Sequence, residues 1–71
     1  MHLVEYYIKE VVSVTDVSEK YEQYENYDGS TMLMVSMIVE CEGIEKEHIQ
    51  IFKESEWKKA EELGWFLDYY S

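Results

Sequence analysis

The chain has 71 residues, of which 46% are hydrophobic and 15% aromatic, and its sixteen acidic residues face six basic ones for a formal net charge of −10. This length fits one domain spanning residues 1–71. Disorder is excluded, because the apolar content is sufficient for a core despite the charge. A compact domain with this charge repels nucleic acids and anionic membranes and attracts basic surfaces, so direct nucleic-acid or membrane binding is not expected.

The single cysteine, Cys41, rules out an internal disulfide and fits a reducing cytoplasm. The opening residues MHLVEYY contain neither a basic segment nor an apolar segment of the kind found in signal peptides. No apolar run approaches the length needed to cross a membrane. We therefore expect a cytoplasmic protein.

Alternation of apolar and polar residues predicts a long first strand, His2–Thr15. Its even positions are apolar except Glu10, so Glu10 marks either a β-bulge or the point where the strand runs past the core. The strongest strand signal is Thr31–Cys41, whose odd positions are apolar almost throughout and whose even positions are apolar for most of its length. This pattern is typical of a strand buried on both faces.

The segment Asp16–Gly29 is ambiguous. Its tyrosines recur every third residue, which places Val17, Tyr21, Tyr24 and Tyr27 on one stripe of a helix. Asp16 with Glu19 resembles a capping box, so a helix is favoured. The Asp28-Gly29 pair is also a hairpin-turn signal, and an extended segment is the alternative.

The C-terminal part predicts a strand, a helix and a further strand. A tight turn at Glu42-Gly43 leads into a strand, Ile44–Lys53. Ser55 is expected to cap a helix, Glu56–Leu63, which ends at Gly64. The aromatic run Trp65–Tyr70 is expected to form a last strand or a tail packed on the core.

Together these elements predict a small α+β domain with an antiparallel sheet of three to four strands and one or two helices. The order strand, helix, strand, strand, helix, strand is that of ferredoxin-like folds, and we favour it. In that topology the first and third strands are central, whereas here the second strand, Thr31–Cys41, is the most apolar. The alternative is a β-meander followed by a C-terminal helix.

No constellation of residues indicates catalysis, and we expect a non-enzymatic protein without a cofactor or a metal. The spacing of His2, His48 and Cys41 matches no zinc signature, although a metal-dependent sensor or small enzyme built on His48 and Cys41 is a minor alternative. The neighbours of Cys41 are glutamates, which disfavour a reactive thiolate, so we expect a small core thiol.

Two acidic runs, Asp16–Asp28 and Glu40–Glu47, are read either as ordinary solvated surface or as a surface that binds a basic protein. In size and composition the chain resembles small acidic proteins of phages and mobile elements that mimic DNA. We therefore favour an inhibitor of a basic nucleic-acid-binding protein, with tyrosines as anchors. The expected partner-binding residues are Glu19, Glu22, Glu25, Asp28, Glu40, Glu42, Glu45, Glu47, Tyr24, Tyr69 and Tyr70. The alternative is a structural homodimer that buries the second face of Thr31–Cys41.

Overall fold

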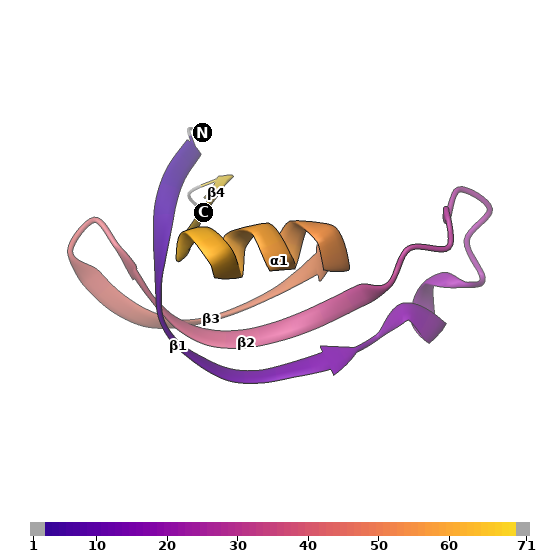
Figure 1. Cartoon of the computed structure of the whole chain (residues 1–71), viewed down its shortest axis with the longest axis horizontal. Coiled ribbons are helices and arrows are strands. Elements are labelled where there is room, and N and C mark those ends of the chain that lie inside the picture. Colours follow the sequence, from indigo (N-terminus) through magenta and orange to yellow (C-terminus); the bar gives the residue numbers. More distant parts are fainter. Residues whose placement is uncertain (1–2, 70–71) are drawn as a thin grey trace.

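The computed structural model describes residues 3–69 and contains a four-stranded antiparallel sheet and one α-helix, which confirms the α+β prediction (Figure 1). A short 3₁₀ helix, η1, follows the first strand. The elements are β1 (Leu3–Asp16), η1 (Ser18–Tyr21), β2 (Met32–Cys41), β3 (Ile44–Lys53), α1 (Glu54–Leu63) and β4 (Trp65–Tyr69).

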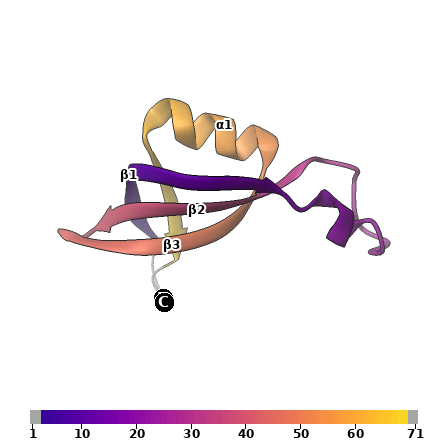
Figure 2. The ribbon, with the colours of Figure 1, turned by 90° about the horizontal axis from the view of Figure 1, so that it is seen from below.

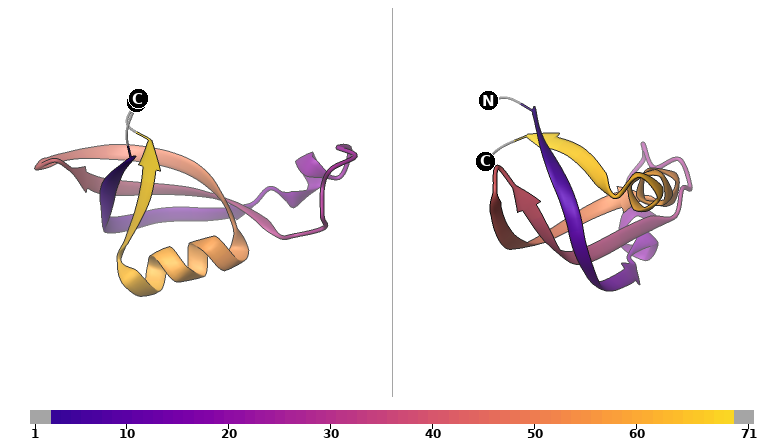
Figure 3. Two further views of the ribbon diagram at one scale, coloured as in Figure 1. Left: turned by 90° about the horizontal axis from the view of Figure 1, so that it is seen from above. Right: turned by 60° about the vertical axis from the view of Figure 1, so that its left-hand side comes forward.

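The strand order in the sheet is β3-β2-β1-β4. Strands β1 to β3 form the meander of the alternative prediction. The helix α1 then crosses the sheet and delivers β4 to the free edge of β1, beside its N-terminal half (Figure 3). The ferredoxin-like order is not confirmed, because β1 and β2 are neighbours with no α-helix between them.

The segment predicted as a helix, Asp16–Gly29, forms a single 3₁₀ turn and then an irregular loop that projects beyond the sheet (Figure 2). The Asp16 carboxylate accepts a hydrogen bond from the backbone N–H of Ser18 at 2.9 Å. This local bond competes with the helical pattern. The tyrosines of the predicted stripe pack on one another, with the Tyr21 ring centroid 6.0 Å from that of Tyr24. The favoured helix over Asp16–Gly29 is therefore wrong.

Two irregularities in β1 explain the polar residue on its predicted apolar face. The register with β2 shifts between Ile8 and Glu10 and again between Val11 and Ser13. The first shift places Glu10 beside Ile38, and the second restores the original alternation. Of the two alternatives for Glu10, the bulge is the one that the register shows. Bulges bend a strand, and β1 curves strongly along its length (Figure 1).

The core lies between the sheet and α1. On β2, Val35, Met37 and Val39 are fully buried, as the odd-numbered face predicts. Trp57 of α1 lies over this face with its ring centroid 5.4 Å from that of Phe52 on β3. The even-numbered side chains of β2 are half-buried and point to the other face of the sheet, which α1 does not cover. The prediction of burial on both faces is therefore correct for one face only.

The two connections around β3 behave differently from one another. The β2–β3 turn has Glu42 and Gly43 at φ 53° and 82°, the positive values that a type I′ turn requires. The helix begins at Glu54, two residues before the predicted start, so Ser55 is not the cap. The cap residue is Lys53, whose backbone N–H donates to the Glu56 carboxylate at 3.1 Å.

No helix formed by residues 3–69 is long and apolar enough to cross a membrane.

We expect Met37→Ala to lower the free energy of unfolding by about 2–5 kcal/mol, because it opens a cavity in the fully buried row. A core of this size contributes on the order of 3–5 kcal/mol, so the variant should lose much of its stability. Ile44→Ala, at a position that is 66% exposed, is the matched control and should change stability little. Urea denaturation followed by tryptophan fluorescence measures both; equal losses would contradict this core.

Glu42→Asn should stabilise the protein, because Asn adopts positive φ more readily than Glu. The expected gain in the free energy of unfolding is about 0.5–1 kcal/mol. Glu42→Gln removes the same charge without the conformational benefit and is the control. If both variants gain equally in thermal or urea denaturation, charge repulsion and not backbone strain is the cause.

Candidate functional site

Residues 3–69 contain no group of three or more His, Cys, Asp or Glu side chains placed to hold a metal ion. Cys41 is buried in the core, as expected of a structural thiol. His48 stacks on the Tyr6 ring at a centroid distance of 5.0 Å, and its Nε2 lies 2.7 Å from Oε1 of Gln50. Cys41 and His48 therefore both make contacts within the fold.

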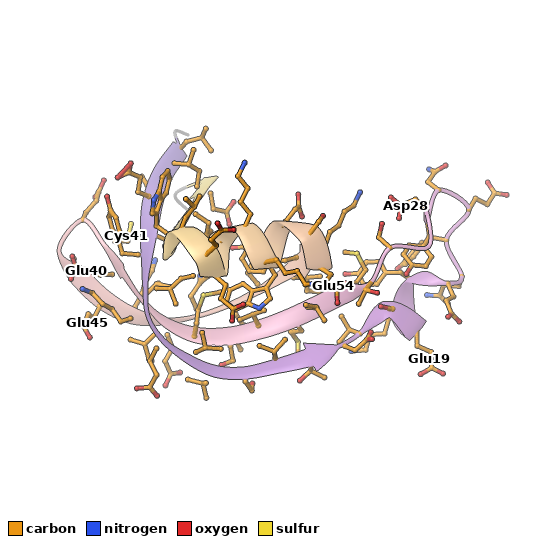
Figure 4. All side chains as sticks on the ribbon, in the orientation of Figure 1. Glu19, Asp28, Glu40, Cys41, Glu45 and Glu54 are labelled. Atoms are coloured by element: carbon orange, nitrogen blue, oxygen red, sulfur yellow. The ribbon has the colours of Figure 1, made fainter. Side chains whose placement is uncertain are left out.

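The two acidic runs lie at opposite ends of an elongated molecule whose longest axis is 39 Å. Figure 4 shows Glu19 and Asp28 at the loop end, and Glu40 and Glu45 at the end formed by the β2–β3 hairpin. The predicted partner-binding residues therefore do not form one continuous site. We call the two groups the loop end (residues 17–31) and the hairpin end (residues 40–47).

The predicted tyrosine anchors come from different parts of the fold. Tyr24 belongs to the loop end and is 59% exposed. The backbone of Tyr69 pairs with Leu3 at the end of β4. Tyr70 lies outside the described residues. Tyr24 and the backbone of Tyr69 are thus on different elements, the loop end and β4.

The loop end is held to the sheet by hydrogen bonds. The backbone N–H of Met32 donates to the Ser18 hydroxyl at 2.8 Å, and the N–H of Val17 donates to the Met32 carbonyl at 2.8 Å. The Tyr27 hydroxyl donates to the Ser30 carbonyl. Beside these bonds lies an open hollow of about 430 Å³, lined by Tyr21, Tyr24, Asn26, Tyr27, Asp28, Met32 and Lys53. The carboxylate of Asp28 therefore adjoins an aromatic surface.

Asp28 is part of this tether. Its Oδ1 accepts a hydrogen bond from the backbone N–H of Ser30 at 2.9 Å, and its Oδ2 lies 3.1 Å from Nζ of Lys53. The hydrogen bonds from Ser30, followed by the contact with the Lys53 ammonium, hold the pKa of the Asp28 carboxyl well below its ordinary value. Asp28 was expected to contact a partner, whereas the structure gives it a bond network within the chain.

At the hairpin end, carboxylates are placed opposite one another. Glu40 on β2 is the direct cross-strand neighbour of Glu45 on β3, a like-charge pairing that disfavours folding. Glu47 is the neighbour of Ile38 in the next row. An ion pair between Lys9 and Glu40, at 3.4 Å, offsets part of this repulsion. The stability of the hairpin thus does not explain the pairing of Glu40 with Glu45.

Two glutamates that the sequence did not assign to a site join this group through β1. Glu10 is paired with Ile38, and so it lies across from Glu47. Glu5 accepts a hydrogen bond from the Tyr7 hydroxyl, which together with nearby carboxylates raises the pKa of Tyr7. In the sequence, only the polar residue Glu10 on an apolar face points to this placement of the glutamates. The face to which a residue beyond a bulge points depends on the register with the neighbouring strand.

Comparison of this chain with protein-family models, with curated proteins and with solved structures found no match. The chemistry of the two ends and of the uncovered sheet face is therefore what points to a function.

We expect the Asp28 carboxyl to titrate below its ordinary pKa of about 3.9 when followed by carbon-detected NMR. A depressed folded-state pKa means that the tether stabilises the fold fully above about pH 4 and is lost as the pH falls through that lower pKa. Lys53→Met should raise the Asp28 pKa only part of the way, because the Ser30 hydrogen bonds remain.

The control for this titration is Lys58→Met, which removes the same charge from a lysine that lies 3.9 Å from Glu54. It should leave the Asp28 pKa unchanged. An Asp28 carboxyl that titrates at or above about 3.9 in the unmodified chain would contradict the tether.

Proposed function

We propose that this chain is a small acidic binding protein, without catalytic activity, that inhibits a basic nucleic-acid-binding protein by occupying its nucleic-acid site. One observation carries the proposal: the protein displays many more carboxylates than it can neutralise. Sixteen acidic residues face six basic ones, so ten carboxylates are left over even if every base is paired. Such an excess attracts a basic surface and is complementary to it.

The distribution of this charge supports nucleic-acid mimicry. All sixteen acidic residues lie among residues 3–69. Ten net charges over a longest axis of 39 Å give about one charge per 4 Å. A single strand of duplex DNA carries one charge per about 3.4 Å. The net charge of the molecule, averaged over its length, is therefore comparable with that of one DNA strand, and a basic groove of that length would meet a similar total charge.

The arrangement within the fold also favours a role in binding over a role in solvation. The Glu40–Glu45 pair places like charges side by side on neighbouring strands, and neither residue belongs to the core. A basic partner that supplies positive charge at this place would relieve the repulsion.

The proposal predicts that the tagged chain retains a basic protein from a lysate of its source cells at low salt. Because ion pairing dominates, retention should fall steeply as salt rises from about 50 to 200 mM. Duplex DNA added in excess should displace the retained protein, because both ligands occupy the same surface. Mass spectrometry identifies the protein, and binding of the purified partner is then measured at each salt concentration.

Paired charge-neutralising variants locate the contact. Glu45→Gln/Glu47→Gln at the hairpin end should weaken binding of the purified partner more than Glu61→Gln/Glu62→Gln on α1, which removes the same charge elsewhere. Glu22→Gln/Glu25→Gln tests the loop end in the same way. Binding that stays constant across the salt range, or a partner that DNA does not displace, would contradict the proposal.

A further inference from the structure

The face of the sheet that α1 leaves uncovered carries exposed isoleucines. The sheet curves around α1, so the uncovered face is convex (Figures 1 and 2). Ile49 and Ile51 of β3 are 64% and 42% exposed and point to this face. Their cross-strand neighbours are Ser36 and Met34 of β2. In a small monomeric domain, exposed apolar side chains grouped on one face indicate an interaction surface.

The register places acidic residues at one border of this apolar area. The next row along the sheet is Glu47, Ile38 and Glu10, and the row beyond it contains Glu45 and Glu40. The convex face is therefore apolar along β3 and the neighbouring part of β2, and acidic toward the hairpin end. We call this surface, formed by Met34, Ser36, Ile38, Ile49 and Ile51 with the glutamates Glu10, Glu40, Glu45 and Glu47, the convex patch.

We propose that the convex patch is the docking surface for the basic partner, and that the partner presents an apolar contact with lysines or arginines at its edge. This inference rests on the proposed function and adds the site. The carboxylates at the border complement basic side chains, and the isoleucines beside them lose their contact with water when the partner binds. Binding surfaces commonly combine a desolvated apolar area with polar residues at its border.

The chemistry of the patch disfavours a second copy of this chain as the occupant. A two-fold dimer would place the same patch on both sides of the interface. Two convex faces touch over a small area, and each brings the four glutamates of the patch toward the same interface. If the copies are aligned, carboxylates face carboxylates. If they are reversed, carboxylates lose water against the isoleucines of the other copy, which is also unfavourable.

The partner chemistry that fits is a concave basic surface. A curved sheet presents its convex side most completely to a groove, and a groove lined by basic residues is the form of many nucleic-acid-binding surfaces. Binding by the patch would bury the isoleucines and block that groove in one step. Electrostatic attraction then sets the rate of association, and the apolar contact slows dissociation.

The test uses two chains that carry the photoreactive amino acid benzoylphenylalanine, one at position 49 and one at position 44. Ile44 is 66% exposed and lies on the same strand as Ile49, but its cross-strand neighbour is the buried Cys41, so it belongs to the opposite face. Each chain is irradiated in the source-cell lysate at low salt, and the adducts are identified by mass spectrometry.

The inference predicts an adduct from position 49 with the salt-released, DNA-displaced protein, at a peptide rich in lysine or arginine, and little adduct from position 44. An adduct of the chain with itself would overturn the inference in favour of a homodimer. Equal adducts from both positions, or none at position 49 while salt-dependent capture persists, would also overturn it and leave the proposed function standing. If no basic protein is captured at all, both the docking surface and the proposed function are wrong.

A second measurement uses the purified partner. Ile49→Thr keeps a β-branched residue in the strand and should weaken binding about tenfold, with the same salt dependence as the unmodified chain. Ile44→Thr is the matched control and should change affinity less than twofold. Near-equal affinities for the two variants would overturn the convex patch, and thermal denaturation confirms that both variants are folded.

Discussion

The structure depends on one constraint: a single ten-residue helix has to provide the cover for the sheet. Trp57 and Ala60 of α1 belong to one buried cluster with the odd-numbered side chains of β2 and with aromatic residues of β1, β3 and β4. A helix of that length covers only one face of a four-stranded sheet. The second face is left to solvent or to a partner, although its central strand contains Met34 and Ile38.

The bulges in β1 determine the shape and the charge of the face that α1 does not cover. They let β1 curve around the core and, at the same position, move Glu10 from the core side to the uncovered side. The type I′ turn at Glu42-Gly43 sets the register of β2 with β3, and this register places Glu40 opposite Glu45. The register of the strands therefore determines both the curvature of the convex patch and which charged and apolar side chains it exposes.

Much of the fold could be predicted from the sequence, because period-two alternation and turn residues report local structure directly. The β2–β3 hairpin, the inward face of β2 and the helix end at Gly64 are confirmed, and of the two alternatives for Glu10 the register shows the bulge. The helix over Asp16–Gly29 is wrong because tyrosines at helical spacing pack equally well on one another in an irregular loop. The strand order depends on which edge of β1 the last strand reaches, and no local pattern encodes that choice.

The candidate site is harder to predict from the sequence than the fold. The acidic runs are visible in the sequence, but in the structure they lie at opposite ends of a molecule whose longest axis is 39 Å. The sequence places Asp28 among the partner-binding residues because its bonds to Ser30 and Lys53 form only after the loop has folded. The exposure of Ile49 and Ile51 could not be read from their alternation, since an amphipathic strand does not reveal which face the helix will cover.

The most direct test of the account is the relaxation of the isoleucine methyl groups by a neutral, water-soluble spin label, recorded by NMR while the purified partner is added. We predict that Ile49 and Ile51 are relaxed strongly in the free chain and become shielded as the complex forms, whereas Ile44 stays accessible. Shielding of Ile44 with continued exposure of Ile49 would contradict docking on the convex patch. Shielding of Ile49 in the free chain that increases with its own concentration would instead indicate a homodimer.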